Sequence, residues 1–197
     1  MSATSITCLI RTIGRASLPA AIESARREFA HVIVVADRVD LDPSFIVDGV
    51  TYLKNEEVID YHGGAGINLG SKSVQTEFFC LLDDDDEYRF GSGDIMQDKL
   101  NSQPEIDIWI PGLVYNDGAV VCMGNYTYPG NVAVPTYRTE LFKEFPFKPI
   151  QEGRDPGFTD YFHVKDIEDT GRTVGWYQRE LYLVRPHLVG RFGGGAV

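Results

Sequence analysis

Short apolar runs alternate with amphipathic segments through residues 1–90. Runs at 5–11, 31–36, 50–53 and 78–82 predict four strands, and the second is almost wholly apolar, as buried parallel strands are. Segments 18–29 and 68–75 predict helices, with Ser17 capping the first and a glycine loop preceding the second. This alternation predicts an α/β fold with a Rossmann-like, mostly parallel sheet flanked by helices.

The second half carries a less regular pattern. Runs at 106–114 and 119–123 predict two strands around an Asn-Asp-Gly turn. Segments 139–144 and 160–170 predict helices, the latter capped by Thr159 and ended by Gly171, and strands follow at 173–177 and 181–184. We expect one domain over residues 1–197.

An acidic run follows the apolar segment 78–82, because Asp83, Asp84, Asp85, Asp86 and Glu87 are consecutive. In an extended chain, residues i and i+2 point the same way, so Asp83 and Asp85 can converge on one ion. Ligands of parallel sheets bind at the carboxyl ends of the strands. The run therefore indicates a divalent-cation site, and a solvated acidic turn is the alternative.

Composition narrows the function classes. The chain has 197 residues and a net charge of -11, which argues against nucleic-acid binding through a broad basic face. Cys8, Cys80 and Cys122 lack the spacing of a metal site and are odd in number, so free thiols in a reducing compartment are expected. No leader pattern and no membrane-length apolar stretch occurs. We expect a cytoplasmic protein without a membrane span.

Several motifs, in order, resemble those of family 2 glycosyltransferases of the GT-A fold. They are ITCLIRTIGR, HVIVVADRVD, INLGSKSVQTEFFCLLDDDD, NVAVPTYRTELFKEFPF, TDYFHVKDIEDTG and LYLVRPH. The resemblance covers nearly the whole chain, with residues 1–90 as a nucleotide-binding half and 91–197 as an acceptor-side half. Four positions depart from the family pattern: Arg11 replaces a proline, Gly14 a polar residue, Ile67 an arginine that contacts the diphosphate, and Thr159 the first of two acids.

The resemblance implies roles for individual residues. Asp160 matches the catalytic base, and Glu152 and Asp155 are rivals in the preceding loop. The remaining implied residues bind the donor (Arg11, Thr12, Arg15, Asp37, Asn68, Lys72, Asp83 and Asp84) or a Mn²⁺ or Mg²⁺ ion (Asp83, Asp85, Asp86 and His187). Five aromatic residues are candidates for sugar stacking, with burial in the core as the favoured alternative: Tyr126, Tyr128, Trp109, Trp176 and Tyr177.

The expected activity is a metal-dependent, inverting transfer of a sugar from a nucleotide-diphosphate sugar, with a UDP-sugar favoured, to a hydroxyl acceptor. A modified base in nucleic acid is a minority choice of acceptor because the chain is acidic. Two alternatives stay open: a sugar nucleotidyltransferase, and a nucleotide- or sugar-binding module without catalysis.

Overall fold

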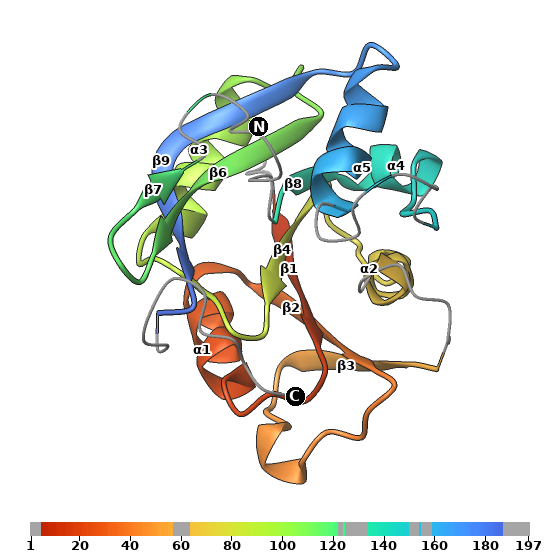
Figure 1. Ribbon diagram of the computed structural model, residues 1–197, viewed down its shortest axis with the longest axis vertical. Coiled ribbons are helices and arrows are strands. Elements are labelled where there is room, and N and C mark those ends of the chain that lie inside the picture. Colours follow the sequence, from red (N-terminus) through yellow and green to blue (C-terminus); the bar gives the residue numbers. More distant parts are fainter. Residues whose placement is uncertain are drawn as a thin grey trace.

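The computed structural model describes residues 5–56, 64–121, 124, 134–149, 154 and 159–186. Its elements confirm an α/β architecture in which helices flank a curled sheet (Figure 1). Along the chain they are β1 (Ile6–Thr12), α1 (Leu18–Glu28), β2 (His31–Asp37), the 3₁₀ turn η1 (Pro43–Phe45), β3 (Val50–Asn55), α2 (Gly64–Ser71), β4 (Phe78–Asp83), β5 (Glu87–Tyr88), α3 (Ser92–Ser102), β6 (Ile108–Tyr115), β7 (Val120–Val121), β8 (Thr136–Arg138), α4 (Thr139–Glu144), α5 (Thr159–Glu168) and β9 (Val174–Val184).

The strands form one sheet in the order β3-β2-β1-β4-β8-β6-β9-β5, with β7 beside β6. Strands β3, β2, β1 and β4 run parallel to one another, as do β6 and β9, whereas β8 is antiparallel to both of its neighbours. Strand β5 lies at the end of this order, four strands away from β4. In sequence, however, the acidic turn Asp83–Asp86 leads directly from β4 into β5. The sheet must therefore curl, and the acidic turn spans its two halves.

Helices α1 and α2 lie on opposite sides of the first strands (Figure 1). Helix α1 begins with a proline in its first turn and buries Leu18, Ala21, Ile22 and Ala25. Helix α2 packs closely on β1 and β2, because a Cβ atom at Gly70 would lie 2.5 Å from a methyl carbon of Leu9 and 2.9 Å from one of Val35. Only glycine permits this helix-to-sheet distance.

The predicted position of the second helix is wrong. The sequence pattern placed it at 68–75 after a glycine loop, but α2 covers Gly64–Ser71 and contains Gly64, Gly66 and Gly70. Glycine disfavours helix in isolation, and here close packing overrides that propensity. Gly66 and Gly70 are one turn apart and both face Val35, so the same face of the helix lies against the sheet.

The predicted pair of final strands is also wrong, because β9 is one strand of 11 residues. Gln178 interrupts it with a left-handed backbone (φ 52°), and the register against β6 shifts at this level. Such a bulge preserves pairing on both sides. The sequence pattern missed α3, β5 and β8, since none carries a clear apolar period.

The core lies between the sheet and the helices. Cys8 and Cys80 are neighbours in the register of β1 and β4 and are buried free thiols, as expected. Trp109 and Tyr177 stack with ring centroids 5.0 Å apart and are also buried, which favours the core alternative for both. Among the described residues, no helix combines the length and the apolar composition needed to cross a bilayer.

Candidate functional site

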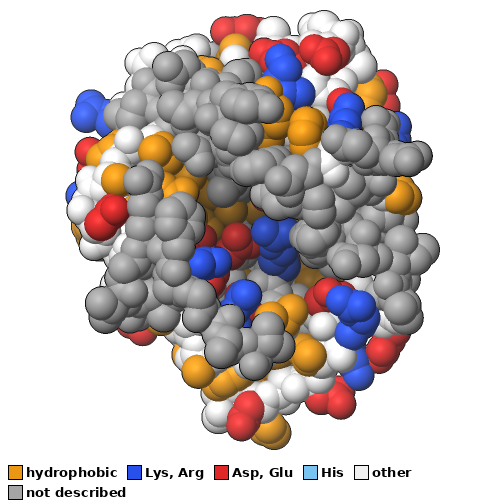
Figure 2. Space-filling view, viewed as in Figure 1, with side chains coloured by type: hydrophobic (Ala, Val, Ile, Leu, Met, Phe, Trp, Pro, Cys, Tyr) orange, Lys and Arg blue, Asp and Glu red, His pale blue; other side chains and the backbone are white. Residues whose placement is uncertain are grey.

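A pocket of about 340 Å³ opens where β1, β2 and β4 end. Because the strands are parallel, Thr12, Asp37 and Asp83 reach the same edge of the sheet. Figure 2 shows basic and acidic side chains gathered in the central hollow of the molecule. The pocket is lined by Arg11, Thr12, Ile13, Arg15, Asp37, Arg38, Asp83, Asp84, Asp85 and Arg185.

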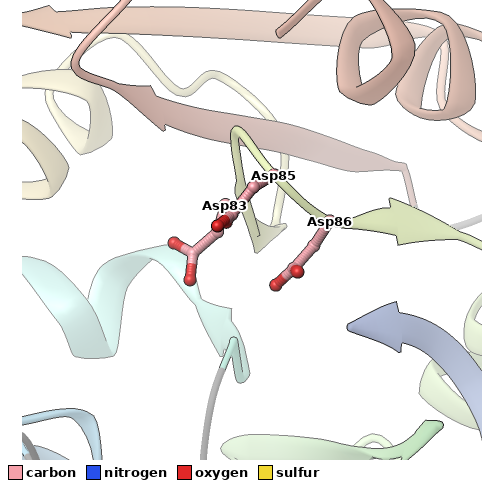
Figure 3. A group of neighbouring side chains, drawn as sticks. All are labelled: Asp83, Asp85 and Asp86. Carbon is pink, nitrogen blue, oxygen red and sulfur yellow. The ribbon is translucent and has the colours of Figure 1, made fainter. Parts of the chain in front are cut away.

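Three carboxylates of the acidic turn converge beside this pocket (Figure 3). One oxygen from each of Asp83, Asp85 and Asp86 lies within 4.8 Å of the others. An oxygen-only donor set of this spacing suits a hard divalent cation such as Mg²⁺ or Mn²⁺. The three residues therefore fit the ion that the sequence predicts.

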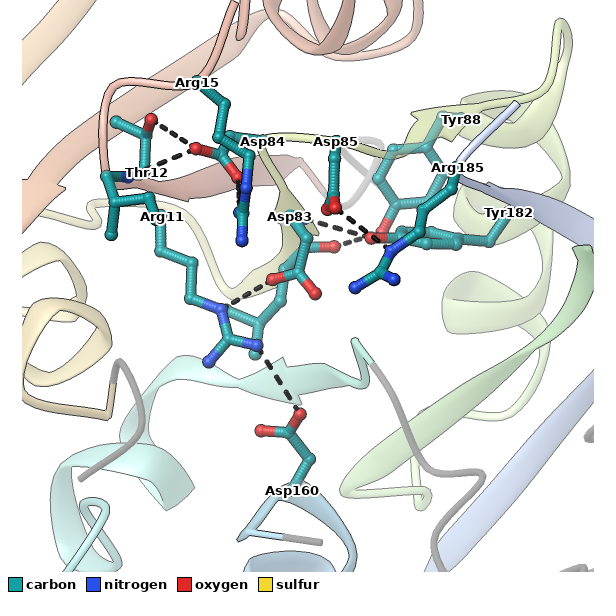
Figure 4. A network of polar contacts seen from close by, with 12 residues as sticks. Arg11, Thr12, Arg15, Asp83, Asp84, Asp85, Tyr88, Asp160, Tyr182 and Arg185 are labelled. Carbon is teal, nitrogen blue, oxygen red and sulfur yellow. Dashed lines mark hydrogen bonds and ion pairs between the residues drawn. The ribbon is translucent and has the colours of Figure 1, made fainter. Parts of the chain in front are cut away.

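Each of the first three aspartates has an arginine partner (Figure 4). The Nε atom of Arg11 donates to Oδ1 of Asp83 at 2.6 Å, as the β1–β4 register requires, because these two residues are Cα neighbours. Arg15 pairs with Asp84. The Nε atom of Arg185, just after β9, lies 3.1 Å from Oδ2 of Asp85. The acidic turn is thus neutralised by guanidinium groups from two separate parts of the chain.

Asp84 is the most deeply held of these acids, with 2% of its side chain exposed. It accepts a hydrogen bond from the Thr12 hydroxyl at 2.6 Å and from the Ile13 amide at 3.2 Å. These bonds tie the turn after β1 to the acidic turn. Asp84 therefore shapes the pocket wall, whereas Asp83 and Asp85 are more accessible.

Asp86 is the most buried of the three converging carboxylates, and the end of β9 contacts it. It accepts a hydrogen bond from the Arg185 backbone amide at 2.7 Å, while the hydroxyl of Tyr182 in β9 accepts one from the Asp83 amide at 3.0 Å. Burial, then the charges of Asp83 and Asp85, raise the pKa of Asp86 well above its usual value. A cation at this position would therefore favour the ionised form of Asp86.

Asp83 behaves differently, although it too is strongly desolvated. Burial raises the pKa of Asp83, but Arg11, Arg15 and Arg185 together outweigh that effect and lower it. Burial, reinforced by Asp83 and Asp84, raises the pKa of Asp85. Of the three converging acids, Asp83 is therefore the one whose ionised form is most favoured, and the ionised carboxylate is the form that binds a cation.

Asp160 approaches the same centre from the first turn of α5. Its Oδ2 atom lies 3.9 Å from Nη2 of Arg11, and 21% of its side chain is exposed. Burial, together with the charge of Asp83, raises the pKa of Asp160 against the opposing effect of Arg11. A raised pKa brings a carboxylate closer to the range in which it accepts a proton efficiently.

Asp37 occupies the end of β2, at the other wall of the pocket. Its carboxylate accepts a hydrogen bond from the side chain of Asn55 at 2.7 Å and from Arg38 at 3.2 Å. Arg38 has a left-handed backbone (φ 59°), which is unusual for a residue with a side chain. The carboxylate is therefore held in a fixed direction at the pocket edge.

Two predicted donor residues lie away from the lining of this pocket. The side chain of Asn68 bonds both the amide and the carbonyl of Phe147, at 2.9 Å each, and so joins α2 to the segment after α4. Lys72 is exposed in the turn after α2. Their donor-binding roles stay predictions. Other predicted residues fall outside the described part of the chain: His187, Glu152, Asp155, Tyr126 and Tyr128.

Sequence reasoning missed Arg38, Asn55, Tyr182 and Arg185. Asn55 ends β3 opposite Asp37 in the register, so its place follows once the strand order is known. Tyr182 and Arg185 reach the acidic turn only because the sheet curls. The sequence signal for Arg185 is its place in the LYLVRPH motif, two residues before the histidine.

The fold and the site together define the class of the protein. It is an α/β protein of the GT-A type, whose pocket lies at the carboxyl ends of the parallel strands. No protein-family model matches the chain, and no curated protein matches it.

Solved structures of Staphylococcus aureus TarS share the fold. TarS 1–349 gives a TM-score of 0.69 at 18% identity, over 91% of this chain and 60% of that chain. Its complex with UDP gives 0.70 at 17% identity over 91% and 60%, and its complex with UDP-GlcNAc gives 0.69 at 16% over 98% and 62%. The chain thus has the glycosyltransferase fold of TarS and spans about 60% of the TarS segment.

Proposed function

We propose that this protein is a family 2 type glycosyltransferase that uses a nucleotide-diphosphate sugar, with UDP as the favoured nucleotide. The pocket at the carboxyl ends of β1, β2 and β4, whose lining holds four arginines together with three aspartates of the acidic turn, is the observation that carries the proposal. The shared fold adds support, because structures of TarS hold UDP and UDP-GlcNAc.

The arginines suit a diphosphate. Arg11, Arg15, Arg38 and Arg185 line the pocket, and a guanidinium group offers paired N–H donors that match phosphate oxygens. The overall charge of -11 repels anions, and in the pocket lining the four arginines only offset four aspartates: Asp37, Asp83, Asp84 and Asp85. A bound divalent cation would shift that balance in favour of an anion. Asp37, held by Asn55, would accept a hydrogen bond from the base of the nucleotide.

Asp83, Asp85 and Asp86 would hold the divalent ion, with His187 as a further ligand. The ion would supply Lewis-acid stabilisation of the negative charge on the departing diphosphate. The contribution of the chain is to hold three oxygen ligands together and to balance their charge. Before an ion binds, Arg11 and Arg185 provide that balance from opposite sides of the turn.

Asp160 is the proposed base. As the acceptor hydroxyl oxygen bonds to the anomeric carbon, its proton passes to the Asp160 carboxylate, and the bond from that carbon to the diphosphate oxygen breaks. The nucleotide diphosphate leaves with the bonding electron pair, and the anomeric configuration inverts. Arg11 lies between the Asp160 carboxylate and Asp83, so base and donor pocket lie on either side of one guanidinium group.

The test measures UDP release from UDP-GlcNAc with Mn²⁺, using water or an added hydroxyl acceptor. Asp160→Asn should lower the rate by about 100-fold or more, as loss of a general base does, and leave the affinity for UDP unchanged. Asp166→Asn is the matched control on α5, since Asp166 pairs with Arg154 away from the pocket.

Other outcomes would favour the alternatives. Release of pyrophosphate from UTP and a sugar 1-phosphate would indicate a nucleotidyltransferase. Binding of UDP-GlcNAc without any product, for the wild type and with several acceptors, would indicate a binding module.

A further inference from the structure

Arg185 connects the end of β9 to the acidic turn through two different groups. Its backbone amide donates to Oδ1 of Asp86 at 2.7 Å, and its side-chain Nε lies 3.1 Å from Oδ2 of Asp85. Asp85 and Asp86 are two of the three acids that converge for a cation. Arg185 therefore occupies, with its own positive charge, the same carboxylates that a divalent ion would use (Figure 4).

The two contacts differ in how easily they can be broken. The backbone contact is the more enclosed of the two, because the amide of Arg185 bonds the buried carboxylate of Asp86. Arg185 makes it with a left-handed backbone (φ 47°). The guanidinium is 38% exposed and lines the same pocket as Arg11 and Arg15. The side chain is thus free to exchange Asp85 for another anion in that pocket while the residue stays in place.

We propose that Arg185 is an internal counter-ion that a divalent cation displaces from Asp85, and that the displaced guanidinium then binds the diphosphate of the donor. This inference rests on the proposed function for the identity of the anion. It makes cation and nucleotide binding interdependent, because each ligand takes over one partner of the same ion pair.

The exchange predicts opposite effects on the two ligands when the side chain is removed. Without the guanidinium, Asp83, Asp85 and Asp86 lose a competing charge, so Mn²⁺ alone should bind more tightly. The diphosphate loses a charge-assisted partner, so UDP should bind more weakly. A residue with only a structural role would lower both affinities together.

Arg185→Gly is the sharpest variant, since glycine adopts a positive φ without strain and keeps the amide that bonds Asp86. Arg185→Lys keeps the positive charge but loses the paired N–H donors of the guanidinium group. Arg89→Gln is the matched control. Arg89 is similarly exposed and forms an ion pair with Glu180 of β9, the strand that precedes Arg185, but it does not line the pocket.

The experiment is isothermal titration of each variant with Mn²⁺ alone, and with UDP in saturating Mn²⁺. For Arg185→Gly we expect Mn²⁺ affinity to rise about threefold to fivefold, as the loss of a partly exposed ion pair permits, and UDP affinity to fall about tenfold or more. Arg185→Lys should lie between, and Arg89→Gln should match the wild type.

Unchanged or weaker Mn²⁺ binding by Arg185→Gly would overturn the inference, as would unchanged UDP binding. If the wild type binds Mn²⁺ but no UDP, the proposed function fails instead. If the wild type binds UDP equally in Mn²⁺ and in a chelator, the exchange is wrong while nucleotide recognition stands.

Discussion

His163 provides a pH-dependent test of how α5 is held in place. It is 9% exposed, and its Nε2 lies 2.8 Å from the carbonyl oxygen of Phe145. A carbonyl only accepts, so Nε2 carries the proton, and Nδ1 accepts from the Tyr137 hydroxyl at 2.9 Å. A second proton would have to go on Nδ1, where it would reverse the bond with the Tyr137 hydroxyl and place a positive charge in a buried site. His163 is one turn after Asp160 and thereby anchors the helix that carries the proposed base.

The magnitude follows from the pKa. Burial lowers the pKa of His163 from 6.5 to about 4. The unfolded chain then binds more protons than the folded one between these values, so stability is full above about pH 6.5 and falls as pH drops toward 4. At pH 4.5 the loss is about 2.5 kcal/mol, from about 1.4 kcal/mol per unit of pKa difference.

The assay is urea unfolding at several pH values from 7.5 to 4.5 for the wild type and for His163→Gln. Glutamine can accept from Tyr137 and donate to Phe145 but does not titrate. Loss of the ring stack on Phe147 (centroids 4.0 Å apart) adds a constant offset. The gap between the two proteins should therefore change by about 2.5 kcal/mol in favour of the variant as pH falls.

Carboxylates titrate in the same range, but they do so in both proteins and cancel in the difference. His31→Gln, at an exposed position of β2, is the control for replacing a histidine by a glutamine. Parallel pH profiles for the wild type and His163→Gln would refute this account of how α5 is anchored.

Two further substitutions test the packing around the pocket by urea unfolding. Gly70→Ala should destabilise the fold by about 1–3 kcal/mol, because its Cβ would overlap Leu9. Gly66→Ala is its control: its Cβ would be 3.5 Å from the nearest side chain, so equal losses at both positions would contradict the packing argument. Thr12→Val should cost about 1–3 kcal/mol by removing a hydrogen bond to buried Asp84, whereas Thr12→Ser should retain most of the stability. A neutral Thr12→Val would show that Asp84 has no need of the hydroxyl.

The sequence predicted the half of the site that depends on neighbouring parallel strands. Apolar runs located β1, β2 and β4, and the residues that end them, Thr12, Asp37 and Asp83, meet at one edge as any parallel sheet requires. The Arg11–Asp83 ion pair also follows from this register, once β1 and β4 are known to be neighbours.

The other half depends on long-range packing that no local pattern encodes. Arg185 and Tyr182 reach the acidic turn because β9 pairs with β5 at the end of a curled sheet. The glycines of α2 are typical of a loop in a sequence pattern, so the pattern misplaces the helix, whereas Gly70 is required by its close contact with the sheet. The apolar pattern predicts two strands where β9 is one, because a bulge at Gln178 interrupts the alternation of apolar positions.

The central claim is that the pocket around Asp83–Asp86 binds a nucleotide diphosphate together with a divalent cation. The most direct measurement is thermal unfolding with UDP, GDP, CDP or dTDP, each with and without Mn²⁺, for the wild type and for Asp85→Asn. Ligands that bind the native state must raise the midpoint. We predict a rise with UDP that requires both Mn²⁺ and Asp85. No rise with any of the four nucleotides would contradict the claim and leave the acidic turn as a structural element held by its own arginines.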